Sequence, residues 1–119
     1  MKTTLIIGAS SNLARYSYMA AQRLTAKGHP VLLLGRKKGF ALDKEIYQEK
    51  IDWKGIDTVT LYINPTHQLE YYDYIISLNP KRVIFNPGTE NSEFVNMLTS
   101  INIVPIEACT LVMLATGEY

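Results

Sequence analysis

Small polar residues gather where the first short apolar segment ends, and their spacing could bind a phosphate group. Gly8, Ser10 and Asn12 follow the apolar residues 5–7. A glycine there allows a tight turn, and the amides that open the following helix can face an anion. The match to G-x-G-x-x-G is partial, since serine and leucine fill the second and third glycine positions. A plain strand-to-helix turn with Ser or Asn as the helix cap is the alternative interpretation.

The residues after the second apolar segment are strongly basic. Arg36, Lys37 and Lys38 stand where an NAD-binding domain needs an acidic residue to hold the ribose hydroxyls. Three adjacent cations favour a ligand with an additional phosphate near its adenosine, either NADP or coenzyme A. A solvated basic turn would explain the same residues without a ligand.

Later apolar segments are followed by further candidate residues. Asn64 and Pro65 have the types of a helix N-cap and a first helical residue. Asn86 and Pro87 open a turn whose polar groups could face a crevice, although a turn before a capped helix needs no ligand. Cys109 is the only cysteine, and such a residue is more often a small buried hydrophobe than a reactive thiol.

Five apolar segments are too short for helices and rich in branched residues, which is typical of strands buried on both faces. They are residues 5–7, 31–34, 59–63, 83–85 and 103–106. With the helical patterns between them, they predict a single α/β domain over residues 1–119. Its fold is a Rossmann-like, doubly wound, mostly parallel five-stranded sheet with helices on both faces. Ligands then bind at the carboxyl edge of the sheet.

Two local patterns carry further expectations. Leu13, Tyr16, Ala20 and Leu24 follow the spacing of a buried helical stripe, which Gly28 would end. Residues 36–55 are irregular, so we expect a loop and a short turn there in place of a crossover helix.

Composition excludes several classes of function. The chain has 119 residues, 47% of them hydrophobic, and a formal net charge of +1, so no global field would recruit nucleic acid or an anionic membrane. A single cysteine and scattered acidic residues offer neither a disulfide nor metal-ligand spacing. No segment approaches the length of a membrane helix. We therefore expect a cytoplasmic protein without a metal site or catalytic residues, with a homodimer or an unknown protein partner left open.

Several motifs together resemble the small stand-alone CoA-binding domain family, relatives of the CoA-binding half of the succinyl-CoA synthetase α subunit. The likeness covers nearly the whole chain, and its motifs occur in the family's order. They are Gly8-Ala9-Ser10-x-Asn12-x-x-Arg15-x-Ser17-Tyr18, Lys37 with Gly39, Ile46-Tyr47, the segment Val83-Ile84-Phe85-Asn86-Pro87-Gly88, and Glu107-Ala108-Cys109.

The resemblance implies a role for each candidate residue. Gly8, Ser10 and Asn12 would hold the CoA pyrophosphate, with Arg15 as a phosphate partner, and Lys37 would lie near the adenosine phosphate. The remaining five would line the rest of the ligand: Asn64 and Pro65 the adenine or ribose, Asn86 and Pro87 the pantetheine arm, and Cys109 the crevice.

The chain also departs from the family's pattern. It has Gly35-Arg36 where the family usually has Asn-Pro, and Phe85-Asn86 where Trp-Gln is commoner, so free CoA and acyl-CoA both remain candidate ligands. The runner-up is an NADP-binding module similar to the nucleotide-binding half of short-chain dehydrogenases. No tyrosine has the lysine at i+4 that this family's catalysis needs. A third alternative is a CoA-dependent sensor or adaptor protein.

Overall fold

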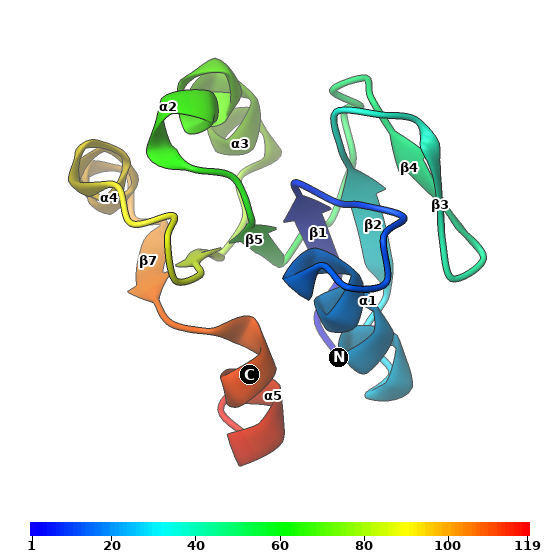
Figure 1. Ribbon diagram of the computed structural model, residues 1–119. Helices are drawn as coiled ribbons and strands as arrows, with labels where there is room; N and C mark the ends of the chain where they lie inside the picture. Colours follow the sequence, from blue (N-terminus) through cyan, green and yellow to red (C-terminus); the bar gives the residue numbers. More distant parts are fainter.

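The computed structural model describes all 119 residues, and its seven strands form one sheet (Figure 1). The strand order is β3-β4-β2-β1-β5-β6-β7. All neighbouring strands are parallel except β3 and β4, which form an antiparallel pair at one edge. The strands are β1 Thr4–Ile7, β2 Val31–Leu34, β3 Gly39–Ala41, β4 Lys44–Tyr47, β5 Thr58–Leu61, β6 Arg82–Phe85 and β7 Val104–Glu107.

The five expected strands are present, whereas the expectation of a loop over residues 36–55 is wrong. This region adds β3 and β4, so the sheet has seven strands and not five. Ile46 is the only buried residue of β4, and it pairs with Leu33 of β2. Because these strands are short and have only one buried residue each, they lack the continuous apolar run that marks the central strands.

Helices cover both faces of the sheet, as the doubly wound prediction requires (Figure 1). They are α1 Tyr16–Ala26, α2 Pro65–Gln68, the 3₁₀ turn η1 Leu69–Tyr71, α3 Tyr72–Leu78, α4 Ser92–Ser100 and α5 Thr110–Thr116. Helices α1 and α5 pack on one face, while α3 and α4 pack on the other. Strand β2 lies beside β1 on one side, and the chain later returns to place β5 beside β1 on the other side. Strand order therefore reverses between β1 and β5.

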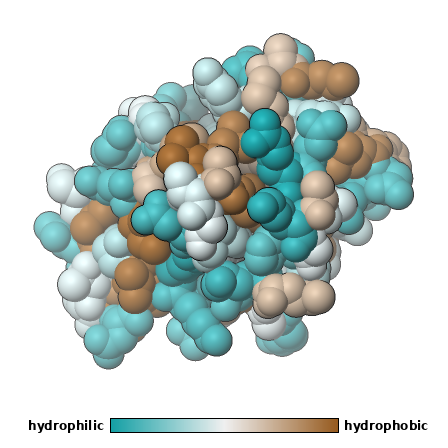
Figure 2. Space-filling model, turned by 90° about the horizontal axis from the view of Figure 1, so that it is seen from below, coloured by the Kyte–Doolittle hydropathy of each residue, from teal (hydrophilic) through white to brown (hydrophobic).

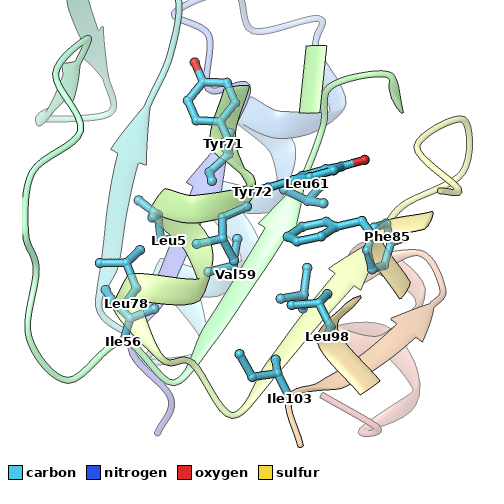
Figure 3. Packing of buried hydrophobic residues seen from close by; sticks show 14 of the residues in the cluster. Leu5, Ile56, Val59, Leu61, Tyr71, Tyr72, Leu78, Phe85, Leu98 and Ile103 are labelled. Carbon is cyan, nitrogen blue, oxygen red and sulfur yellow. The ribbon is translucent and has the colours of Figure 1, made fainter. Parts of the chain in front are cut away.

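The larger core cluster lies between the sheet and helices α3 and α4 (Figure 3). Leu5, Val59 and Phe85 reach it from three adjacent strands, and the ring of Phe94 stacks on that of Tyr72 at 4.3 Å between centroids. The smaller cluster, on the opposite face, includes the small residues of α1 that let this helix approach the sheet closely. Burial on both faces explains why the central strands read as apolar runs.

Two expectations about helices are wrong. Leu13 lies before α1, and Tyr16 begins it, and both side chains are mostly exposed, at 71% and 69%. Ala20 and Leu24 are buried as expected, and Gly28 follows the end of the helix with a φ of +84°. The C-terminal helix α5 was not expected, since its apolar residues follow directly on the last strand.

Exposed apolar side chains lie in small groups between polar ones on the side of the molecule seen from below Figure 1 (Figure 2). Isolated exposed apolar residues such as Val112 are ordinary on protein surfaces. None of the helices combines the length and the apolar character that crossing a bilayer requires.

Candidate ligand-binding site

A cavity of about 660 Å³ opens at the carboxyl ends of β1, β2 and β5, where strand order reverses. The segments that follow β1, β2, β5 and β6 form its walls together with the start of α1, and the turn after β6 contributes residues 87–89. The turn after β1 contributes residues 8–11, the turn after β2 contributes residues 36–38, and the segment after β5 contributes residues 62–64. This is the position at which doubly wound sheets bind their ligands.

Two glycines allow these turns to approach one another. Gly8 has a φ of +95°, and a Cβ built there would lie 2.9 Å from the backbone carbon of Tyr62. A Cβ on Gly35 would lie 2.5 Å from the carbonyl oxygen of Ala9. The amides of Gly8 and Ala9 both donate to the Leu34 carbonyl, at 2.9 and 3.0 Å. Gly8 thus shapes the turn, and its amide is not available to a ligand.

Free backbone donors lie next to this turn. The amides of Ser10 and Ser11 donate to no group within the protein, and the α1 N-cap, Arg15, makes no side-chain capping hydrogen bond. Helix α1 also has no acidic residue in its first turn. In contrast, Asn64 caps α2 and Asn91 caps α4 with their side chains. An uncapped helix N-terminus beside free amides favours an anion.

Cations surround these donors, and no acidic residue lines the cavity. The lining residues with basic side chains are Arg15, Arg36, Lys37, Lys38 and His67. The Nζ of Lys38 forms an exposed ion pair with Oε1 of Glu49 at 3.5 Å. The concentration of positive charge in one cavity of a chain with net charge +1 indicates an anionic ligand.

A buried amide holds two walls of the cavity together. Gln68 is fully buried, and its Nε2 donates to the carbonyl oxygens of Ile63 and Thr89, at 2.9 and 2.8 Å. Its Oε1 accepts a hydrogen bond from Asn91 at 2.9 Å. These contacts join the segment after β5 to the turn after β6. Gln68 therefore positions the cavity without lining it.

A second buried amide anchors helix α5. The Nδ2 of Asn86 donates to Thr60 Oγ1 at 2.7 Å and to the Leu61 carbonyl at 2.8 Å, and its Oδ1 accepts from the Thr110 amide at 2.8 Å. Thr60 and Thr110 also share a hydroxyl hydrogen bond of 2.8 Å. Both amide hydrogens of Asn86 are thus bound within the fold, and the side chain positions the start of α5 against β5.

A smaller cavity of about 270 Å³ shares Tyr16, Tyr62 and Pro87 with the larger one. Its other lining residues are Asn86, Cys109 and Leu111. The Tyr62 hydroxyl lies out of reach of solvent and has no hydrogen-bond partner. Burial raises the pKa of Tyr62 to about 12, so this hydroxyl is protonated at neutral pH.

The structure brings most of the predicted site residues to these two cavities. Gly8, Ser10, Arg15, Lys37, Asn64 and Pro87 line the larger cavity, and Asn86, Pro87 and Cys109 line the smaller one. Asn12 and Pro65 line neither. Asn12 is exposed and accepts a hydrogen bond from the Ala14 amide at 2.9 Å, while Pro65 takes the first position of α2.

Sequence reasoning missed three residues that shape the site: Tyr62, His67 and Gln68. His67 lies in the short helix α2 and lines the larger cavity. The roles of individual residues toward a ligand stay predictions.

Comparisons with known proteins agree with the fold that the structure shows. A family model described as a CoA binding domain matches residues 2–115. The solved structure of an uncharacterized protein is 55% identical and has a TM-score of 0.99, covering 100% of this chain and 98% of its own. No curated protein gives a significant match.

More distant structures share the fold. A hypothetical protein from Pyrococcus horikoshii OT3 is 23% identical with a TM-score of 0.85, covering 93% of this chain and 80% of its own. A protein from Thermus thermophilus is 18% identical with a TM-score of 0.84, covering 99% and 91%. Because the family model spans nearly the entire sequence, this protein belongs to the CoA binding domain family.

Proposed function

We propose that the protein binds coenzyme A or an acyl-CoA in the two adjoining cavities, without catalysing a reaction on it. The observation that carries the proposal is the larger cavity, in which free backbone amides, an uncapped helix N-terminus and several cations meet with no acidic residue. The diphosphate of the ligand would lie against Ser10, Ser11 and the start of α1. Such donors bind phosphate oxygens well.

The basic turn after β2 would contact the phosphate on the adenosine. Lys37 is exposed, lines the cavity and has no ion-pair partner, whereas the neighbouring Lys38 is paired with Glu49. The pantetheine arm would then run past Pro87 into the smaller cavity. The proposal includes no catalytic step, because neither the His67 ring nor the Cys109 thiol is joined by a hydrogen bond to another titratable group.

A thermal-shift screen of the purified protein with CoA, acetyl-CoA, NADP and NAD tests the proposal. Ligand at one hundred times its Kd raises the free energy of unfolding by about 2.7 kcal/mol. This corresponds to a rise of several degrees in Tm for a domain of this size. We expect a CoA species to give the largest shift and NAD the smallest. A larger shift with NADP would contradict the proposal and favour the NADP-binding module.

The Lys37→Ala variant tests where the adenosine end lies. Loss of a charge-assisted contact should weaken CoA by about 1–3 kcal/mol and leave dephospho-CoA nearly unchanged. Lys27→Ala is the matched control, because Lys27 is exposed at the opposite end of α1 and carries the same charge. Equal losses for both ligands in Lys37→Ala would show that this lysine supplies only a general field.

A further inference from the structure

The smaller cavity differs in chemistry from the larger one that it adjoins. None of its lining residues is an acid or a base, and four of the six are hydrophobic. Tyr16, Tyr62 and Pro87 form a common wall, so a ligand can extend from the larger cavity into the smaller one. The anionic part of a ligand has its partners in the larger cavity only.

Asn86 and Tyr62 offer no free polar atom to a ligand in the smaller cavity. Both amide hydrogens of Asn86 are bound to Thr60 and Leu61, and its oxygen accepts from Thr110. The Tyr62 hydroxyl is buried out of reach, so this residue presents its ring and not its oxygen. A charged group placed here would lose hydration without a charged partner to compensate.

We propose that the smaller cavity receives the acyl group of a short-chain acyl-CoA, and that the protein binds apolar acyl thioesters more tightly than free CoA. This inference rests on the proposed function, in which the phosphates of the ligand occupy the larger cavity. Apolar cavities of about 150 Å³ hold a benzene molecule, so about 270 Å³ has room for a short chain. Cys109 then contacts the chain as part of an apolar wall.

A series of acyl-CoA ligands of increasing chain length, measured by isothermal titration calorimetry, tests the inference. We expect affinity to rise from free CoA through acetyl-CoA to butyryl-CoA, by up to about fourfold for each methylene fully buried. Palmitoyl-CoA should gain nothing further, because its chain exceeds the cavity. Equal affinity for free CoA and all acyl-CoA ligands would overturn the inference and leave the proposed function standing.

Succinyl-CoA offers a sharper comparison with butyryl-CoA. Both acyl groups have four carbons, and the succinyl group ends in a carboxylate where the butyryl group ends in a methyl. The smaller cavity has no cation to pair with this carboxylate, so we expect succinyl-CoA to bind at least tenfold more weakly than butyryl-CoA. Binding of succinyl-CoA as tight as that of butyryl-CoA would overturn the inference.

The Leu111→Phe variant assigns the acyl group to this cavity. The larger side chain would fill space next to Tyr62, so the preference for butyryl-CoA over free CoA should fall at least fivefold. Val112→Phe is the matched control, because Val112 is the next residue of α5, is 56% exposed and does not line the cavity. An unchanged preference in Leu111→Phe would contradict the placement. Failure of the wild-type protein to bind any CoA species would overturn the proposed function itself.

Discussion

Substituting Asn86 by aspartate should destabilise the protein, and the loss should grow with pH. The substitution keeps the oxygen that accepts from the Thr110 amide and replaces the nitrogen that donates to Thr60 and Leu61. An ionised carboxylate oxygen would then face the Leu61 carbonyl oxygen at the distance of a hydrogen bond. Asn86 is only 3% exposed, so water cannot screen this repulsion.

The size of the effect follows from these contacts. The lost hydrogen bond to the Leu61 carbonyl costs about 1 kcal/mol, and a buried charge without a neighbouring cation brings the total to about 3–4 kcal/mol at pH 7. At low pH the protonated carboxyl can donate one hydrogen bond again, so the cost falls to about 1 kcal/mol. The difference corresponds to a pKa for this aspartate raised by about two units in the folded state.

The sign of the pH dependence is therefore fixed. The pKa of this aspartate is raised in the folded state above its unfolded value of about 3.9. The protein therefore loses stability as pH rises from the unfolded pKa to the folded pKa, and loses no more above it. Urea denaturation followed by circular dichroism at several pH values between 4 and 7 gives the free energy of unfolding. Subtracting the wild-type value at each pH removes the contributions of groups common to both proteins.

Asn64→Asp is the matched control. Asn64 is exposed, its Oδ1 accepts from the His67 amide at 3.1 Å, and aspartate is an equally good N-cap. Its stability should stay within about 0.5 kcal/mol of the wild-type value at every pH. The reasoning would be refuted if Asn86→Asp cost less than about 1 kcal/mol at pH 7, or if its cost did not grow with pH.

Three further predictions concern the packing and titration of single residues. Gly35→Ala should lower the free energy of unfolding by about 2–3 kcal/mol in urea denaturation, because its Cβ would strike a backbone carbonyl oxygen at 2.5 Å. Gly39→Ala meets nothing closer than 3.9 Å and should cost less than 0.5 kcal/mol, roughly the usual scatter of surface substitutions; equal losses would contradict the clash. Tyr62→Phe removes a buried hydroxyl without a partner and should be neutral or stabilising by about 1 kcal/mol, visible as an unchanged or higher Tm. The control, Tyr74→Phe, should cost about 1 kcal/mol, because the Tyr74 hydroxyl donates to the Ile51 carbonyl at 2.6 Å. A clear loss of stability in Tyr62→Phe would contradict the prediction, because it would mean that the Tyr62 hydroxyl has a hydrogen-bond partner. Burial, together with the nearby N-terminus and basic side chains, lowers the pKa of His29 from its ordinary 6.5. As pH drops below 6.5, the unfolded chain therefore binds a proton at this histidine before the folded protein does, and the free energy of unfolding falls. This fall should be weaker in His29→Gln when unfolding is measured between pH 5 and 8, and an identical pH profile would rule out His29 as the cause.

The sequence predicts those parts of the fold that local patterns encode. Branched apolar runs mark the four strands β1, β2, β5 and β6, because each of them is buried on both faces. A similar run marks β7, although this edge strand has no buried residue. Asn64 and Pro65 mark the start of α2, and Asn79 ends α3 with a φ of +51°. These signals depend on residues within a few positions of one another.

The parts that sequence reasoning missed depend on distant contacts. Strands β3 and β4 are short and have one buried residue each, and the pairing of residues 46 and 47 with residues 33 and 34 of β2 places them in the sheet. The apolar run of α5 follows β7 closely, and its start is defined by the contact of Thr110 with Asn86, which is 24 positions away.

The candidate site shows the same division. The polar turn after β1 and the basic turn after β2 are visible in the sequence because the residues of each turn are continuous. Gln68 and Tyr62 carry no local signal in the sequence. Gln68 holds the cavity by a hydrogen bond to Thr89, which is 21 positions away, and Tyr62 matters because it lines both cavities.

A titration of ¹⁵N-labelled protein with CoA, followed by amide chemical shifts, tests the central claim most directly. We predict that the largest shifts fall on Ser10, Ser11 and the first turn of α1, with further shifts at residues 36–38. Thr4 and His29, at the opposite edge of the sheet, should not move. Shifts confined to that opposite edge, or no shifts at millimolar CoA, would contradict the claim that this protein binds CoA at the carboxyl ends of its strands.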